Sequence, residues 1–479
     1  MRKYIQNATI VTMDAALGIV QGSILIENGI IQEVFLDPQS MEVSCAEIID
    51  GSSMIVIPGM TNAHYHSYSN LLKGTTSNLP LELWSLFSVA YGYSLDDQDM
   101  ELAVLLGVIE MIRSGITCCI DHFPHHQRIE AALRAYEQSG MRVGFAPMMH
   151  DVPDDCFLSV QLPQNIKKQF HSANQRTIEE IKDIYMSLVK QWHRKNGRIS
   201  ILLGPNAPQR CSSEMLKMCK KLSEDEGLYV HTHLLETKIQ KLAGDHQFSK
   251  GIIGWLEEHG LVSKKLSAAH SIWLEDSEIA YLVENGVTFV HNPASNMILG
   301  SGKAPLNKFL LLDGNVALGT DASNCGISHN MFEIMRLAVM IHRLEETNYE
   351  KWPQPEHVFK MATIGGAKAL GDDGRRGKIK KGFIADLVLI NKNSTVFSGI
   401  HDLVSQLVFY ENGSDINYVM IDGNWILKDG KITTFCEEEV IKKAQERFED
   451  ISERFQHALR LAVEAKPFFE KVIYSCYQP

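Results

Sequence analysis

Two pairs of histidines, each with one residue between its members, could bind a metal ion. His64 and His66 follow Met54–Ile57, an apolar and β-branched run that predicts a strand, and His231 and His233 end a later run of the same kind. Residues two apart on a strand share a face, so both members of a pair can reach one site. Neutral imidazoles are common metal ligands. We expect both histidines of the first pair to be ligands, His233 to be a third, and His231 to be a core residue or a neighbour of the ligands.

Two acids, Glu236 and Asp321, and a further histidine, His270, also follow predicted strands. Asp321 could complete a set of three histidines and one aspartate around a catalytic metal and leave one position for water. Water on such a metal becomes acidic and can act as a nucleophile. Glu236, in a dry pocket beside the metal, would suit a proton shuttle. The alternatives are that Glu236 is only a charge at a helix N-terminus and that Asp321 only opens a turn.

The elements that must position these residues alternate between apolar runs and longer amphipathic runs from Met54 to about Ala369, which is typical of βα units. Eight such strands over about 300 residues predict a closed (β/α)8 barrel, whose loops meet at the carboxyl ends of the strands. The polar residues that follow the strands would then lie together. The predicted strands are Met54–Ile57, Ile116–Ile120, Arg142–Met148, Ile199–Leu203, Leu228–His231, Leu266–Ala269, Val287–Val290 and Val316–Gly319.

The two ends of the chain share short strand-like runs and tight turns. Asn28–Gly29 between two apolar runs is a strong hairpin signal. We expect both ends to pair into one small β-sandwich beside the barrel, which makes the fold class α/β. The expected domains are 1–57 and 373–435 for the sandwich, 58–372 for the barrel, and 436–479 for an amphipathic helical tail docked on the protein or on a second subunit.

Composition limits the class of protein. The 479 residues are 45% hydrophobic and 22% charged, as in an ordinary globular protein with a sizeable core. The 46 basic and 58 acidic residues give a net charge of −12, which disfavours nucleic acid as a partner. Nine scattered cysteines without a Cys-x-x-Cys motif indicate reduced thiols. No apolar run is long enough to cross a bilayer, and we expect a cytoplasmic protein.

These motifs resemble those of the amidohydrolase superfamily, in the branch of cytosine deaminase, guanine deaminase, S-adenosylhomocysteine/methylthioadenosine deaminase and the triazine hydrolases. They occur in the order found in that family, and the resemblance covers nearly all of residues 1–435. The matching segments are Ile57–His66, His231–Glu236, His291–Asn296 with Leu299 and Gly302, and Leu318–Asp321.

The resemblance implies one divalent metal, zinc or iron, with zinc as the first expectation. Members that use two metals bridge them with a carboxylated lysine on the fourth strand, and Ile201–Asn206 contains no lysine. The ligands implied are His64, His66, His233 and Asp321.

The resemblance also implies a reaction, the hydrolytic deamination of a C=N unit. Asp321 and His270 would take the proton of the attacking water, and Glu236 would protonate the ring nitrogen before ammonia leaves. The implied catalytic residues are Glu236, His270 and Asp321.

Substrate contacts are expected from loops after the first, second and fourth strands. Leu79–Trp84 begins an aromatic-rich stretch that could stack on a flat ring or form a lid helix. Members that deaminate nucleosides are expected to carry a further acid in this loop for the ribose hydroxyls; Ser85–Ser94 offers none, which disfavours a nucleoside substrate. Arg210 could pair with a carbonyl or anionic edge, or brace the helix that begins at Ser212. The predicted substrate-binding residues are Trp84, Gln209, Arg210 and His122.

Three functions remain open. The first is a metal-dependent aminohydrolase that deaminates a purine, pterin, pyrimidine or triazine. The second keeps the same machinery but expels chloride or an alkylamine, or opens a cyclic amide. The third, a binding protein without catalysis, is disfavoured because all the implied metal and proton-transfer residues are present. We expect a small heterocycle as the partner molecule, neither nucleic acid nor membrane, and a homo-oligomer of two or more chains.

Overall fold

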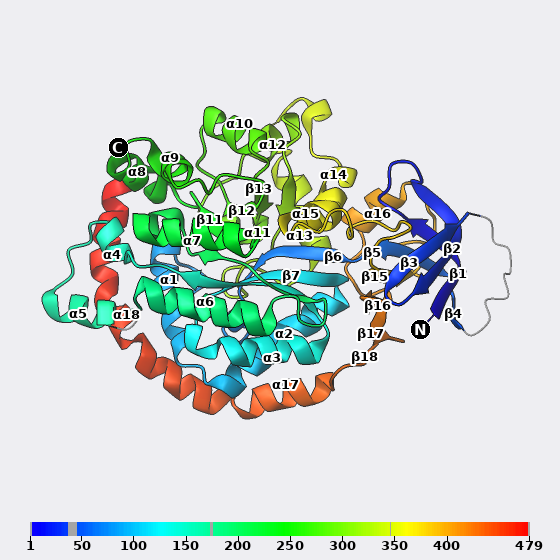
Figure 1. The fold of residues 1–479 in the computed structure, drawn as a ribbon, viewed down its shortest axis with the longest axis horizontal. Coiled ribbons are helices and arrows are strands. Elements are labelled where there is room, and N and C mark those ends of the chain that lie inside the picture. The colour runs from blue at the N-terminus through cyan, green and yellow to red at the C-terminus, as the bar shows by residue number, and fades with distance from the viewer. Residues whose placement is uncertain (1, 37–45, 173–175, 345, 478–479) are drawn as a thin grey trace.

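The computed structural model describes residues 2–36, 46–172, 176–344 and 346–477. A large lobe of helices surrounds a barrel of strands, and a smaller lobe of strands lies at one side (Figure 1). Among the described residues, no helix combines the length and the apolar character needed to span a membrane.

Parallel strands occupy eight positions in the barrel, as predicted. They form one sheet from β6 to β10 and another from β11 to β14, and isolated bridges between Leu203 and Val230 and between Tyr65 and Asp321 close the ring. In chain order the strands are β6 (Met60–Tyr65), β7 (Ile116–Phe123), β8 (Arg142–Met149), β9 with β10 (Ile199–Ile201 and Gly204–Pro205), β11 (Val230–Leu234), β12 (Leu266–His270), β13 (Thr288–His291) and β14 (Val316–Leu318).

The prediction that Met54–Ile57 is the first barrel strand is wrong. That run is β5 (Met54–Pro58), which pairs with strands of the terminal sheet, and the barrel begins one strand later with β6. Gly59 separates the two strands, and a side chain there would meet Thr117 at 2.2 Å. The chain can therefore pass this point only with glycine.

The terminal sheet draws on both ends of the chain, as predicted. Its order is β18-β17-β16-β15-β5-β1-β2-β3, with β4 added to β1. Asn28 and Gly29 form the hairpin between β2 and β3 with φ of 51° and 80°. The predicted domain boundaries remain predictions. The strands are β1 (Arg2–Val11), β2 (Ile19–Glu27), β3 (Ile30–Phe35), β4 (Ala46–Asp50), β5, β15 (Leu387–Asn391), β16 (Ile416–Ile421), β17 (Asn424–Lys428) and β18 (Lys431–Ile432).

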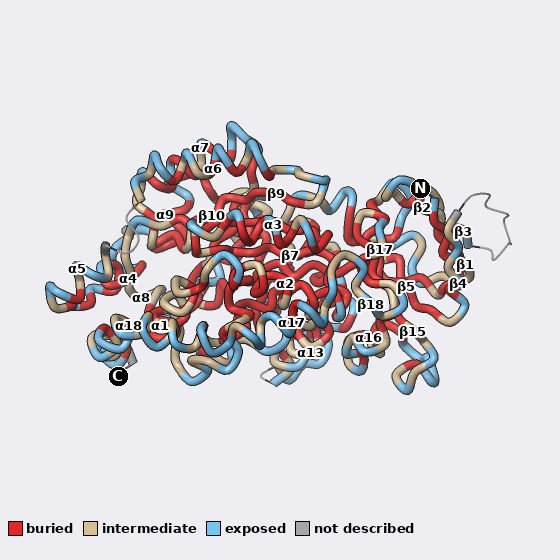
Figure 2. Tube along the Cα trace, turned by 90° about the horizontal axis from the view of Figure 1, so that it is seen from below, coloured by how far each residue is buried: buried red, intermediate tan, exposed pale blue. Residues whose placement is uncertain are grey.

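Helices cover the barrel, so the buried residues fill the centre of the large lobe and the exposed ones gather on its peripheral helices (Figure 2). They are α1 (Leu81–Tyr93), α2 (Asp97–Arg113), α3 (Ile129–Ser139), α4 (Asp154–Phe157), α5 (Gln164–Ser172), α6 (Ile178–Trp192), α7 (Ser213–Asp225), α8 (Lys238–Gln247), α9 (Gly251–Glu258), α10 (Asp276–Glu284), α11 (Pro293–Ile298), α12 (Leu306–Leu311), α13 (Met331–Ile341), α14 (Pro355–Lys360), α15 (Gly366–Ala369), α16 (Leu403–Phe409), α17 (Glu437–Glu446) and α18 (Phe448–Tyr477).

The last two helices run along the edge of the large lobe (Figure 1). Arg447 and Arg454 both bind the buried carboxylate of Asp99 on α2. Apolar residues of α18, among them Phe469, belong to one buried cluster with Leu83 of α1. The tail thus docks on the same chain, against the helix that follows the first barrel strand.

Candidate active site

Three histidines and one aspartate converge at the carboxyl ends of the barrel strands. His64 lies in β6, His66 just after it, His233 in β11 and Asp321 just after β14. Asp321 Oδ1 is 3.3 Å from His66 Nε2 and 3.6 Å from His64 Nε2, and the Nε2 atoms of His66 and His233 are 3.4 Å apart. Ligands of a tetrahedral zinc lie about 3.3–3.4 Å from one another, given bonds of about 2.0–2.1 Å. These three distances are close to those between the ligands of one metal ion.

The ring orientations also fit a metal. His66 Nδ1 donates to the carbonyl of His122 (2.5 Å) and His233 Nδ1 to the carbonyl of Asn206 (2.6 Å). Carbonyl oxygens only accept, so each ring carries its proton on Nδ1 and turns the Nε2 lone pair toward the cluster. His64 Nε2 is buried and has no hydrogen-bond partner among the described residues. This donor set fits one divalent cation.

The charges of the cluster favour a cation as well. Burial lowers the pKa of His64 and of His233 well below the ordinary value, so both rings are neutral. Burial opposes the ionisation of Asp321, but contacts with His66 and His270 outweigh it and lower the pKa of that carboxyl. At His66, burial disfavours the protonated ring, but contact with Asp321 outweighs it and raises the pKa of the ring. Neutral His64 and His233 beside the Asp321 carboxylate are the protonation states that metal binding requires.

The backbone is held in an uncommon conformation at this site. His270 and Asp321 have φ of 70° and 63°, and Leu235 and Ser271 beside them have 45° and 46°. The left-handed region costs a residue other than glycine about 1–3 kcal/mol, and it persists where the surrounding structure enforces it. Here it occurs at the ends of three barrel strands, β11, β12 and β14.

The predicted proton-transfer residues meet at the edge of the cluster. His270 Nε2 is 3.5 Å from Glu236 Oε2 and 3.6 Å from Asp321 Oδ2, while His270 Nδ1 donates to Asn296 Oδ1 at 3.0 Å. Burial, together with the charges of Asp321 and Glu82, raises the pKa of Glu236 well above the ordinary value. The raised pKa favours the protonated form of Glu236, which could give a proton to a bound molecule.

A second buried acid, Glu82, was not predicted to belong to the site. It lies in α1, and Thr237 Oγ1 donates to its Oε1 at 2.5 Å. Burial raises the pKa of Glu82, and its charge acts on Glu236. One indication of this role was present in the sequence: Glu82 is the one acid in the otherwise uncharged segment Leu79–Trp84.

Trp84 and Gln209, two of the predicted substrate-binding residues, are buried, and each has a polar atom without a hydrogen-bond partner among the described residues. Trp84 packs in a cluster with Leu299 and with Ala322, the neighbour of Asp321. The Trp84 indole nitrogen and Gln209 Oε1 have no hydrogen-bond partner among the residues that the structure describes. Contact with substrate remains a prediction for both.

The other two predicted residues have partners within the protein. Arg210 Nε lies 2.9 Å from Asp154 Oδ1, and its Nη1 donates to Asn206 Oδ1 at 3.0 Å. His122 is fully buried, with its ring centroid 4.7 Å from that of His233. Arg210 thus braces the loop that orients His233, and His122 lies against the metal-binding rings; their roles toward substrate remain predictions.

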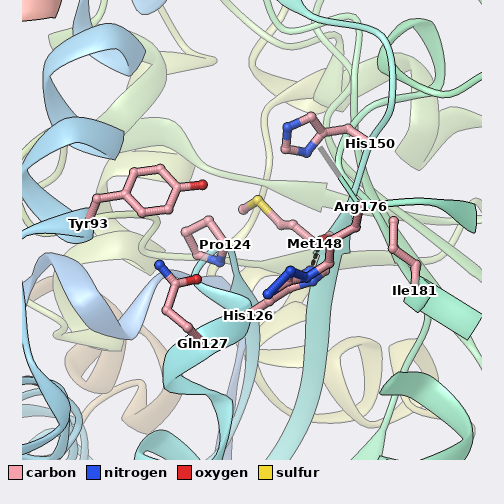
Figure 3. A pocket seen from close by; sticks show the side chains of 8 residues that line it. All are labelled: Tyr93, Pro124, His126, Gln127, Met148, His150, Arg176 and Ile181. Atoms are coloured by element: carbon pink, nitrogen blue, oxygen red, sulfur yellow. Dashed lines mark hydrogen bonds between the residues drawn. The ribbon is translucent and has the colours of Figure 1, made fainter. Parts of the chain in front are cut away.

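A separate cavity of about 30 Å³ lies beside the site (Figure 3). Tyr93 reaches toward it from α1, and His150 and Arg176 lie across from that ring. Met148 links it to the site, because its Sδ accepts a hydrogen bond from Asn206. This volume is enough for about two water molecules. Its lining is Tyr93, Pro124, His126, Gln127, Met148, His150, Arg176 and Ile181.

Comparison with known proteins assigns the family. Residues 55–426 match the model described as the Amidohydrolase family. The chain belongs to this family. It is 32% identical over 453 residues to the 5′-deoxyadenosine deaminase of Methanosarcina mazei, covering 94% of this chain and 98% of that one. It is 34% identical over 440 residues to the 5-methylthioadenosine/S-adenosylhomocysteine deaminase of Pyrococcus furiosus, covering 92% and 98%.

Among solved structures, the zinc complex of atrazine chlorohydrolase from Arthrobacter aurescens TC1 superposes with a TM-score of 0.84 at 22% identity, over 93% of this chain and 99% of that one. These comparisons confirm the predicted family and the predicted barrel with an additional domain. They also confirm the general function: the amidohydrolase is a metal-dependent hydrolase of carbon–nitrogen bonds that deaminates an aminated heterocycle.

Proposed function

We propose that this amidohydrolase deaminates an adenine nucleoside whose 5′ carbon carries hydrogen or a thioether in place of the hydroxyl. The observation that carries the deamination is the buried carboxyl of Glu236, which lies 3.5 Å from His270 beside the histidine cluster. The nucleoside is supported by two relatives that are alike over nearly their whole length and are named for such substrates.

We assign the metal site to His64, His66, His233 and Asp321, and zinc as the metal, because three imidazoles and one carboxylate suit zinc in a catalytic site. A zinc ion held there would supply an acidified water as the nucleophile.

The residues of the chain then move the protons. His270 and Asp321 accept the proton of the water that attacks C6 of the purine. As the C6–O bond forms, electrons move to N1, and Glu236 gives its proton to that nitrogen. The amino group takes the proton held by His270 and Asp321 and leaves as ammonia, while the C6 hydroxyl proton passes to Glu236, so that water and the aminopurine nucleoside become the 6-oxo nucleoside and ammonia. An acid already placed at N1 stabilises the transition state more than the ground state.

Glu82 supports a nucleoside over a free base. Its buried carboxyl lies close enough to Glu236 to raise the pKa of that acid, and Thr237 Oγ1 donates a hydrogen bond to it. Carboxylate oxygens accept bonds from paired hydroxyls, so we assign Glu82 to the ribose hydroxyls. This acid lies just before the stretch Ser85–Ser94, whose lack of acids had disfavoured a nucleoside.

A substrate panel tests the proposal. Ammonia release would be measured with 5′-deoxyadenosine, methylthioadenosine, adenosine, adenine, guanine and atrazine, using protein loaded with zinc. We expect kcat/KM for the 5′-modified nucleosides to exceed that for adenine by at least about 100-fold, since a site built for hydroxyls rejects a substrate without them. Glu82→Gln should shrink this ratio. Equal rates on adenine would contradict the nucleoside, and chloride from atrazine without ammonia from any purine would contradict the deaminase.

We also propose that the protein forms a homo-oligomer and is located in the cytoplasm.

A further inference from the structure

His231 forms the middle of a buried hydrogen-bond chain that ends on a metal-binding histidine. Its Nε2 is 2.8 Å from His64 Nδ1, and its Nδ1 is 2.7 Å from Ser267 Oγ. Ser267 stands opposite His231 on the neighbouring strand β12, and its Oγ lies 3.2 Å from the carbonyl oxygen of Val230. The side chains of His64, His231 and Ser267 are all fully buried.

The carbonyl at one end fixes the direction of every bond. Since the Val230 carbonyl can only accept, the Ser267 hydroxyl donates to it and accepts from His231 Nδ1. His231 Nε2 then carries no proton and accepts from His64 Nδ1. His64 is thereby left with a bare Nε2, the atom that faces Asp321 at 3.6 Å. With the opposite direction, His64 Nε2 would carry a proton into the cluster and could not be a ligand.

This arrangement sets His64 apart from the other two histidines of the cluster. His66 and His233 donate directly to backbone carbonyls. The bond direction at His64 is instead set through two intervening side chains, His231 and Ser267. We propose that His231, held by Ser267, is the positioning residue that fixes the tautomer and ring orientation of His64 and so sets the affinity for the metal. The inference rests on the metal site assigned above, but its test needs no substrate.

Three variants separate orientation from packing. His231→Leu keeps a similar volume and removes the acceptor for His64. His231→Gln offers an amide oxygen to His64 and an amide hydrogen to Ser267. Ser267→Ala removes one hydroxyl and little volume. The matched control is His342→Leu, since His342 is buried and its Nε2 lies 3.1 Å from another imidazole, His291, which the proposal does not make a ligand.

Zinc affinity would be measured by competition with a chromophoric chelator, and the absorption spectrum of the cobalt-substituted protein would report ligand geometry. We expect His231→Leu to weaken zinc binding by about 10- to 100-fold and to alter the cobalt spectrum, as loss of a partner of a ligand does. Ser267→Ala should weaken zinc in the same direction. His231→Gln and His342→Leu should stay near the parent protein.

Zinc affinity unchanged in His231→Leu, or lowered equally in His342→Leu, would overturn the inference. A parent protein that binds no zinc would overturn the metal site itself, and ammonia release plays no part in either result.

Discussion

Glu236 is the residue on which the proposed proton transfer to the ring depends. Because burial and two neighbouring carboxyl groups raise its pKa, it holds a proton that Gln cannot supply. We expect Glu236→Gln to lower kcat by at least about 100-fold, the contribution usual for a general acid. Zinc content should not change, because Glu236 is not among the ligands. Steady-state kinetics and metal analysis check both points.

The control for this variant is Glu278→Gln on α10, which removes a carboxyl that pairs with Lys241. It should leave kcat within about twofold, as expected for a substitution outside the site. A Glu236→Gln enzyme with full kcat would show that the ring nitrogen takes its proton elsewhere.

The residue types and spacing predicted most of this cluster, because alternate positions on strands and the carboxyl ends of a barrel are regular geometry. The positive φ of His270 and Asp321 could not be predicted, since both depend on the packing around two strand ends. Glu82 was missed for a similar reason. One acid in an apolar segment shows its role only when the helix that carries it is placed beside Glu236.

The buried carboxylate of Asp99 on α2 joins that helix to the tail formed by α17 and α18. Asp99 is fully buried and binds Arg447 at 2.5 Å and Arg454 at 2.6 Å, and it also accepts from the backbone N–H of Asp96. We expect Asp99→Ala to lower the free energy of unfolding by about 2–3 kcal/mol, less than for a fully buried ion pair because the two arginines are partly exposed. Urea unfolding measures the loss.

Glu101→Ala on the same helix is the control, since Glu101 pairs with Arg134 at the surface. An exposed ion pair contributes at most about 1 kcal/mol. Equal losses from Asp99→Ala and Glu101→Ala would mean that the tail does not depend on the buried carboxylate.

At the level of elements, the amphipathic pattern predicted the tail helices but left open what they pack against. The order of the runs along the chain also led to one wrong prediction, the choice of the first barrel strand. Met54–Ile57 has the composition of a buried barrel strand, and only its pairing with β1 and β15 shows that it belongs to the terminal sheet. Composition predicts burial, whereas partner strands depend on long-range contacts.

The whole protein should lose stability in mild acid because several buried histidines are neutral when folded. Burial lowers the pKa of His329 to about 4 and that of His125 to about 3. Unfolding returns each to about 6.5, so below that pH the unfolded chain binds more protons. The free energy of unfolding of the metal-free protein should therefore fall between pH 6.5 and 5, by up to about 1.4 kcal/mol per pH unit for each such group.

Urea unfolding of the metal-free protein at several pH values measures this slope. His329→Gln should reduce it by the contribution of one proton. A stability that is flat from pH 6.5 to 5 would show that these imidazoles are protonated in the folded state.

The architecture of the whole chain was predictable because eight βα units and two matching ends leave few ways to arrange a barrel and a companion sheet. The substrate was not, because the proposed substrate contacts of Trp84 and Glu82 depend on how α1 buries these side chains, which the sequence pattern does not specify.

The most direct test of the account is to measure metal content and ammonia release from 5′-deoxyadenosine on the same preparation, before and after removal of the metal by a chelator. The account predicts one zinc per chain, no ammonia from the metal-free protein, restored release when one equivalent of zinc is returned, and none from Asp321→Asn under the same conditions. Undiminished ammonia release from the metal-free protein, or none from protein that holds one zinc per chain, would contradict it.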